Sequence, residues 1–311
     1  MAEAPPDPAG RAARVGLSLD HMGDNLAELG GALDRVCALG VESAEIFLPS
    51  MGVVLGGRVQ RRRLARMAGI CAQRPIGLTL HGPLSADLGD CENRVIQRDT
   101  ARAGLEAAAE CGATVYVQHQ TIAPTPDRQV VERRLACERE SLVELAEDAA
   151  AAGVTLGVEC MFCHPGEWTA LPHELAAQIA AVGHPSVGAV IDFSHAALNA
   201  AARGAALSPS LAALAPHARH LHIHDSFARA PAFRPWTRGD AMAFGFGDLH
   251  LPPGDGALDW ESFAGLAFGE RGIVANLELD KRWALDYPDA IAWTRDWIAR
   301  MGAERRAAAN G

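Results

Sequence analysis

The sequence lacks the features that mark exported and membrane-spanning proteins. Its first residues, MAEAPPDPAGRAAR, contain no apolar core of the kind that a secretory signal has. No stretch of about 18 residues is apolar and free of charge, so the sequence predicts no transmembrane helix. The seven cysteines are odd in number and are scattered without the spacing of a disulfide framework. These absences together predict a reduced, cytoplasmic protein.

Positive charge is also scarce. The chain has 28 Lys and Arg against 38 Asp and Glu, which gives a formal net charge of −10. Nucleic-acid-binding proteins gain affinity from basic side chains that contact phosphates, so this balance argues against nucleic acid as a partner. Several bound divalent cations would offset much of the negative charge. The oligomeric state stays open, and a homo-oligomer is compatible with the sequence.

Short apolar segments alternate with longer segments of helical periodicity. The predicted helices are 25–39, 59–72, 92–111, 129–152 and 173–182, and the predicted strands are 15–19, 43–47, 76–81, 114–119, 154–159, 187–192, 219–224 and 273–279. Eight strands that alternate with helices predict a parallel sheet, and eight is the number that closes a (β/α)₈ TIM barrel. An open doubly wound sheet is the alternative, but LSLDHMGD after the first strand offers no glycine-rich phosphate turn.

We therefore expect a single barrel domain. It should span residues 15–302, because no internal boundary is visible in the composition. Residues 1–14 are rich in Pro and Ala and predict a disordered lead-in. Residues 303–311 are expected to form a flexible tail.

Metal-binding side chains stand at or just beyond the ends of successive predicted strands. They are His81, His119, Glu159, Asp192, His195, His222, Asp248, His250 and Glu278. The carboxyl ends of barrel strands meet at one mouth, so we expect these residues to converge. A lone histidine at a strand end is more often a hydrogen-bonded core residue, but repetition over six strands favours a metal site. Mixed His, Asp and Glu ligands suit zinc, manganese or iron(II).

The stretch HLHIHDS at residues 220–226 is the most informative part of this pattern. Side chains alternate faces along a strand, so His220, His222 and His224 should share one face. The alternative is that alternate histidines decorate a half-polar strand. Asp225 follows, and it could orient a ligating histidine, as carboxylates beside metal sites do.

A long loop is expected after the seventh strand, at residues 226–247. It carries arginines among aromatic residues, and a loop of this length is usually functional or disordered. We predict that it is a lid over the site; the alternative is a solvated excursion whose aromatics pack on the barrel. The side chains expected to bind substrate are His224, Arg229, Arg234, Trp236, Arg238 and, after the eighth strand, Lys281.

These residues resemble the superfamily of xylose-isomerase-like TIM barrels, which holds sugar isomerases and epimerases as well as endonuclease IV. The resemblance covers residues 15–297 and is carried by HGPLSADL at His81, VE at Glu159, IDFSH at 191–195, HIHD at 222–225 and LE at Glu278. It implies that one common metal is held by Glu159, Asp192, His222 and Glu278. It also implies that His195 binds a second metal or the substrate.

The endonuclease IV branch adds ligands for a three-metal cluster, and this sequence has residues where they would lie. They are His81, His119, His195, Asp248 and His250, and the DLH run is followed by a GDG run that is similar to that branch. The resemblance thus implies one to three divalent ions per chain. Three loops depart from the branch: QTIAP follows His119, CMFCH follows Glu159, and the usual TCH is missing after Asp192. Those loops would contact DNA, so the departures put DNA repair in doubt.

Two enzymatic hypotheses follow. The first is a metal-dependent isomerase or epimerase of a small sugar-like substrate, in which Glu159 and Glu278 exchange protons and His195 assists. The second is a phosphoester hydrolase with a multinuclear metal site, acting on a phosphorylated substrate. A barrel that only binds a metal or a sugar is a third class. We favour the isomerase, because the superfamily's small-substrate members are diverse and no nucleic-acid surface is evident.

Overall fold

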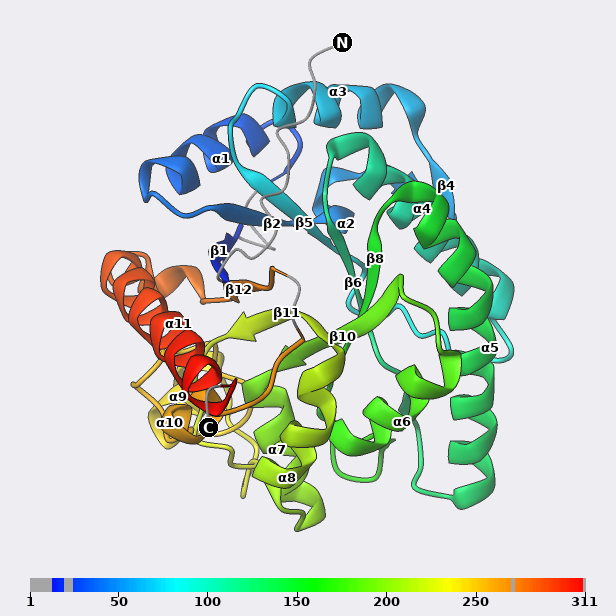
Figure 1. Cartoon of the computed structure of the whole chain (residues 1–311). Coiled ribbons are helices and arrows are strands. Elements are labelled where there is room, and N and C mark those ends of the chain that lie inside the picture. The colour runs from blue at the N-terminus through cyan, green and yellow to red at the C-terminus, as the bar shows by residue number, and fades with distance from the viewer. Residues whose placement is uncertain (1–12, 20–24, 270–271, 310–311) are drawn as a thin grey trace.

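Eight parallel strands close into a barrel, with helices packed around it (Figure 1). The computed structural model describes residues 13–19, 25–269 and 272–309. The barrel strands are β1 (Arg14–Ser18), β2 (Ser43–Phe47), β5 (Gly77–His81), β6 (Val115–His119), β8 (Thr155–Glu159), β10 (Val187–Asp192), β11 (Ala218–Ile223) and β12 (Val274–Leu277). Their order around the barrel is β1-β12-β11-β10-β8-β6-β5-β2. The predicted TIM barrel is confirmed, and the open sheet is excluded.

The helices that connect and cover these strands follow the expected alternation. They are α1 (Leu29–Ala38), α2 (Leu48–Met51), α3 (Arg61–Cys71), α4 (Arg94–Cys111), α5 (Arg128–Ala152), α6 (Pro172–Val182), α7 (Phe193–Arg203), α8 (Leu207–Leu214), α9 (Arg238–Phe244), α10 (Trp260–Ala264) and α11 (Tyr287–Ala309), with the 3₁₀ turns η1 (Ala215–His217) and η2 (Lys281–Trp283). Helices α4 and α5 end at Gly112 and Gly153, which have left-handed φ values of 73° and 66°. Glycine tolerates this conformation best, which explains the glycine stops before the next strands. None of the described helices is long and apolar enough to cross a membrane.

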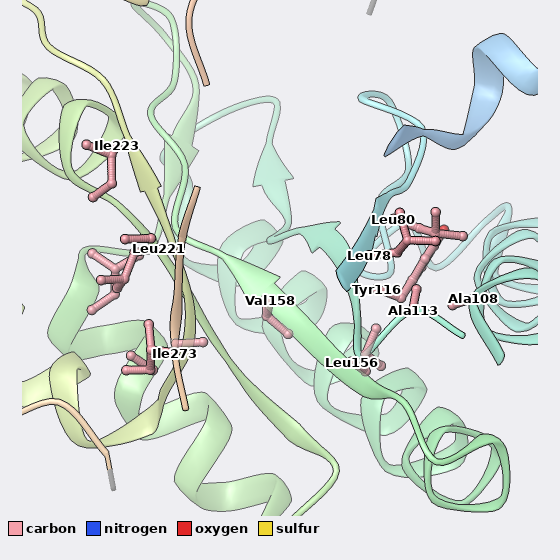
Figure 2. Close-up of a cluster of buried hydrophobic side chains, with 14 of the residues drawn as sticks. Leu78, Leu80, Ala108, Ala113, Tyr116, Leu156, Val158, Leu221, Ile223 and Ile273 are labelled. Atoms are coloured by element: carbon pink, nitrogen blue, oxygen red, sulfur yellow. The ribbon is translucent and has the colours of Figure 1, made fainter. Parts of the chain in front are cut away.

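Side chains on β11 alternate between the barrel interior and the apolar core outside the strands. Leu221 and Ile223 point away from the barrel axis and pack among the buried apolar residues outside the strands (Figure 2). His220 and His222 therefore point into the barrel, where both are completely buried. His224, just beyond the strand, is also completely buried. The three histidines do share a face, so the half-polar, solvent-exposed strand is excluded.

Two small two-stranded antiparallel sheets were not predicted from the sequence. Strands β3 (Val54–Leu55) and β4 (Arg58–Val59) pair beside α4, and β7 (Ile122–Ala123) pairs with β9 (Trp168–Thr169). The second pair joins the loops that follow β6 and β8. It therefore braces two of the segments that leave the carboxyl end of the barrel.

The segment 226–247 is not a loop throughout, because it contains helix α9. Thr237 accepts a hydrogen bond from the backbone N–H of Asp240, and Asp240 accepts one from the backbone N–H of Thr237. This capping box starts the helix, and Gly245 with a φ of 68° ends it. These local helix signals, Thr237 with Asp240 and then Gly245, were present in the sequence.

The expectation of unpaired cysteines is wrong for one pair. Cys91, in the loop before α4, forms a disulfide with Cys137 in the middle of α5, and their Cα atoms are 5.8 Å apart. The pair is separated by 46 residues, so its spacing carried no signal in the sequence. It forms because α4 and α5 pack side by side (Figure 1).

The terminal segments are only partly described. Residues 1–12 of the predicted lead-in lie outside the described residues. Helix α11 continues to Ala309, which is beyond the domain boundary expected at residue 302.

Candidate metal centre

Four side chains from four strands converge at the carboxyl end of the barrel. Glu159 ends β8, Asp192 ends β10, His222 lies on β11, and Glu278 directly follows β12. Nδ1 of His222 lies 2.9 Å from Oε1 of Glu159 and 3.0 Å from Oε2 of Glu278. One ligand atom from each residue lies within 4.8 Å of the others, and all four side chains are buried. We call this set the central group.

Glu159 is shared with a second set of ligand atoms. Its Oε2 atom lies 3.3 Å from Nε2 of His81 and 3.4 Å from Nε2 of His119, whereas its Oε1 atom faces His222. The other ring nitrogens are tied to the backbone. Nδ1 of His81 lies 2.8 Å from the carbonyl of Gly82, and Nδ1 of His119 lies 2.8 Å from the carbonyl of Leu84. A proton on each Nδ1 leaves Nε2 as the free electron-pair donor, which suits a metal ligand.

A third set of ligand atoms lies next to the central group. It comprises His195, His224, Asp248 and His250, whose ligand atoms again lie within 4.8 Å of one another. Nε2 of His250 is 2.7 Å from Oδ2 of Asp248, and Nε2 of His195 is 3.4 Å from the same oxygen. His224 was expected to bind substrate, but its Nε2 lies 2.7 Å from Oδ2 of Asp192 in a fully buried position. It thus joins the ligand sets.

The electrostatics of the site follow from burying so many opposite charges together. Burial favours the neutral form of Glu159, but His222, His195 and His81 outweigh it and hold the pKa of this carboxyl well below its usual range. Burial opposes the charged form of His222 as well, yet Glu159, Glu278 and Glu45 raise its pKa well above the ordinary value. His119 differs, because burial dominates over Glu159 and lowers its pKa to about 4.

The donor set fits divalent metals. Mixed imidazole and carboxylate ligands suit zinc, manganese or iron(II). The ligand atoms are within reach of common ions, and Nδ1 of the buried His195 forms no hydrogen bond, although it lies 3.4 Å from Oε1 of Glu159 and 3.5 Å from Oδ2 of Asp192. An unpartnered buried polar atom is expensive unless a ligand satisfies it. All nine residues predicted as metal ligands are brought together here.

The sets open into a cavity of about 440 Å³. Its walls include Ser18, Leu84, Met161, Phe162, Arg238 and Lys281, as well as ligand residues from all three sets. Arg238 and Lys281, both expected to bind substrate, therefore lie at the cavity. Arg229, Arg234 and Trp236 are exposed and are not among the residues that line it. Arg229 instead lies over the ring of Phe227.

The sequence suggested that Asp225 could orient a ligating histidine. Its hydrogen bonds go elsewhere. Its carboxylate accepts hydrogen bonds from the backbone N–H of Gly254, at 2.9 Å, and from Nε1 of Trp260, at 2.9 Å. A Cβ atom at Gly256 would collide with Oδ1 of Asp225. The GDG run thus lets this loop close against Asp225, which fixes the segment that carries Asp248 and His250.

The family described as "Xylose isomerase-like TIM barrel" matches residues 33–300. The chain belongs to this family. The match contains all nine predicted metal ligands, so the resemblance deduced from the strand ends is confirmed at the level of the family. No curated protein sequence matches the chain.

Several solved structures share the fold of this chain at low sequence identity. A D-tagatose 3-epimerase-like protein has a TM-score of 0.67 at 17% identity, over 94% of this chain and 99% of its own. The TTHB071 protein from Thermus thermophilus, soaked with ZnCl₂, has a TM-score of 0.61 at 23% identity, over 91% and 99%. The IOLI protein with a bound zinc atom has a TM-score of 0.65 at 18% identity, over 93% and 97%.

Glu45 is a charged residue of the barrel interior that was not predicted from the sequence. Glu45 on β2 is completely buried, with Nε2 of His220 2.9 Å from its Oε2 atom and Nε2 of His222 3.2 Å from its Oε1 atom. A signal was present, since a carboxylate inside the apolar strand SAEIF needs a donor or a cation, as Glu159 does. Its partners, however, lie on a strand some 175 residues away.

Proposed function

We propose that the protein is a divalent-metal-dependent isomerase or epimerase of a small sugar or sugar-like molecule. The observation that carries this proposal is the central group: its four side chains could hold one ion, and its two glutamates, Glu159 and Glu278, line a cavity of small-molecule size. Proteins whose structures are described as epimerases of D-tagatose, D-psicose and L-ribulose share the fold, which supports the choice of substrate class.

Glu159 and Glu278 would act as the acid and base. In the barrel order β8 and β12 are separated by β10 and β11, so the two carboxylates approach the cavity from different sides. One carboxylate would remove a proton from the carbon next to a carbonyl, and the other would return a proton. The result is an inverted carbon in an epimerase or a shifted carbonyl in an isomerase. Positioned carboxylates typically raise the rate of such proton transfers by about 10²–10⁴-fold. A divalent ion held by the central group would supply electrophilic stabilisation of the substrate oxygens. Zinc, manganese and iron(II) all suit the ligands.

The direct experiment is exchange of substrate hydrogen with solvent. Protein loaded separately with zinc and manganese is incubated in D₂O with a panel of ketoses and aldoses, free and phosphorylated, and the spectra are followed by proton NMR. We expect loss of the signal of the hydrogen next to the carbonyl for at least one member. Glu278→Gln should abolish this exchange while the metal stays bound with weakened affinity. A protein that carries metal and exchanges no panel member would contradict the proposal.

A second function, phosphoester hydrolysis, is favoured by one specific observation. Both oxygens of Glu159 face imidazoles, with His81 and His119 at Oε2 and His222 at Oε1. This is the arrangement of a carboxylate that bridges two ions, and a bridging carboxylate has no oxygen left to move a proton. Two or three ions would then be held by the three ligand sets, and such sites stabilise both the attacking and the leaving oxygen of phosphoryl transfer.

The third ligand set separates the two functions. Asp248→Asn and His250→Gln remove ligands from that set and leave the four residues of the central group intact. If the enzyme is an isomerase, hydrogen exchange should persist at a rate within about tenfold of wild type. If it is a hydrolase, cleavage of a small phosphodiester such as bis(4-nitrophenyl) phosphate should fall by about 10²-fold or more, together with the number of bound ions.

A further inference from the structure

Below the central group, Glu45 is surrounded by donors from several strands. The hydroxyl of Thr79 on β5 donates to Oε2 at 2.9 Å, and the hydroxyl of Ser18 on β1 donates to Oε1 at 3.3 Å. Asn276 on β12 donates to Ser18 Oγ at 2.8 Å. Ser18, Glu45 and Thr79 are register partners on adjacent strands, so they form one layer of the barrel interior. The carboxylate is therefore held in place by its own hydrogen bonds.

His222 connects this layer to the metal-binding layer above it. Its Nδ1 atom faces Glu159 and Glu278, whereas its Nε2 atom lies 3.2 Å from Oε1 of Glu45. A neutral imidazole has one proton for two nitrogens, and a nitrogen that binds a metal must be unprotonated. Nδ1 can bind a metal in the neutral ring only when the proton is on Nε2. In this fully buried position the proton needs an acceptor. Oε1 of Glu45 lies 3.2 Å from Nε2, and a small turn of the imidazole ring would complete the hydrogen bond, which the present ring orientation does not form.

We propose that Glu45 is a positioning residue for metal binding: its carboxylate accepts a hydrogen bond from Nε2–H of His222, which keeps the proton on Nε2 and leaves Nδ1 free to bind the ion of the central group. The assignment rests on the metal-binding part of the proposed function and not on the substrate. Carboxylates that hold a ligating histidine in this way typically contribute about 10–100-fold to metal affinity. Because Glu45 lies beneath the cavity and does not line it, its effect should reach the reaction through the metal.

His220 provides the matched control. It lies on the same strand as His222, is equally buried, and its Nε2 atom is 2.9 Å from the other oxygen of Glu45. It does not belong to the central group, although its ligand atom lies within 4.8 Å of ligand atoms of Glu45 and His222, which makes these three residues a further candidate set. If Glu45 served only to keep the barrel interior folded, Glu45→Gln and His220→Gln would lower the melting temperature alike and leave metal affinity alike.

The first readout is the zinc dissociation constant, measured by competition with a chelating dye at pH 7.5. We expect Glu45→Gln to raise this constant by about 10–100-fold, and His220→Gln to change it by less than about threefold. A constant for Glu45→Gln within threefold of wild type would overturn the assignment. So would the loss of one whole zinc equivalent in both variants, because Glu45 and His220 would then be ligands of a separate ion.

The second readout is the proton itself, observed by NMR of zinc-loaded protein with ¹⁵N-labelled histidine. In the wild type, His222 should show a slowly exchanging N–H on Nε2 with a strongly downfield proton, and in Glu45→Gln this resonance should move upfield. A His222 ring that carries its proton on Nδ1 would overturn the assignment. The wild-type spectrum decides the question even if Glu45→Gln does not fold. Neither readout uses a substrate, so failure of the isomerase proposal would leave both results interpretable.

Discussion

Oε1 of Glu159 lies 2.9 Å from Nδ1 of His222, although the two residues are 63 positions apart in the chain. The contact joins the end of β8 to β11 across the intervening β10. The other oxygen of Glu159 faces the second ligand set, so this one carboxylate connects two groups of ligands. The organisation of the whole site can therefore be probed through a single side chain.

Replacing that carboxylate should reduce the metal content more than any other single change. We expect Glu159→Gln to weaken zinc binding at the central group by about 10–100-fold, because the negative charge of this ligand is lost. If the carboxylate bridges two ions, as the hydrolase alternative requires, the second set should lose its ion as well. His119→Gln removes a ligand from the second set only and serves as the comparison. Zinc is counted by atomic emission after gel filtration. Equal zinc content in Glu159→Gln and wild type would show that Glu159 is not a shared ligand.

Metal binding should release protons near neutral pH. Burial opposes protonation of His81, but its contacts with Glu159 outweigh this and raise its pKa to about 8; Asp248 likewise outweighs burial and raises the pKa of His250 to about 9. Both rings are thus protonated at pH 7 without metal and must lose a proton to bind an ion. Affinity for zinc should rise with pH up to about 9. Titration calorimetry at pH 7 in buffers of different ionisation enthalpy should show proton release, and heats independent of the buffer would contradict this.

A buried glutamate away from the site should make stability depend on pH. Glu138 on α5 accepts a hydrogen bond from the backbone N–H of Thr121. Burial and nearby Asp87 raise its pKa to about 8, against the opposing effects of that hydrogen bond and of Arg134. A raised pKa favours the protonated form in the folded state. The contribution of Glu138 to the free energy of unfolding is therefore fully present below pH 4.5, the ordinary pKa of a glutamate, and is lost as the pH rises through about 8.

Glu138→Gln should remove this dependence, because glutamine keeps an acceptor for Thr121 without a titrating proton. Urea unfolding at several pH values between about 5 and 9 measures the pH dependence of the free energy of unfolding. We expect the free energy of unfolding to fall more steeply on the alkaline side in the wild type than in the variant, because His81 and His250 contribute equally to the pH dependence of both. Glu140, an exposed residue of the same helix, gives the control Glu140→Gln. Parallel curves for wild type and Glu138→Gln would contradict the prediction.

Arg238 should govern the binding of anionic substrates. It lies at the cavity and pairs with Asp280 at 3.2 Å, and its side chain is half exposed. A guanidinium in this place suits a phosphate or carboxylate group. Arg238→Ala should raise KM for a phosphorylated substrate by about 5–50-fold and change kcat little, since a rim contact of this kind contributes about 1–2 kcal/mol. Arg66→Ala, on the exposed face of α3, is the matched control.

The barrel could be predicted from the sequence because its signals are local. The strands 43–47 and 187–192 were placed at their observed bounds, since each is a short apolar run that ends at a turn or a polar residue. The convergence of the nine candidate metal ligands could be predicted for a related reason: the carboxyl ends of parallel barrel strands meet at one mouth, whatever their separation in the chain. The position of each residue at or just beyond a strand end was thus enough to predict that they converge.

What escaped prediction depends on contacts between distant elements. The role of Glu45 depends on strands β1, β5 and β11, and the bond between Cys91 and Cys137 depends on the packing of α4 against α5. The placement of His224 among the ligands and of Asp225 against the GDG run depends on how the loop after β11 folds back. None of these pairings leaves a periodic or spaced pattern in the sequence.

The claim on which the rest depends is that Glu159, Asp192, His222 and Glu278 hold one ion together. Diffraction from zinc-loaded crystals, recorded on both sides of the zinc absorption edge, locates the ion without reference to activity. We expect an anomalous peak about 2.0–2.2 Å from one oxygen of each carboxylate and from Nδ1 of His222. No peak among these four residues, in crystals shown by fluorescence to contain bound zinc, would contradict the account.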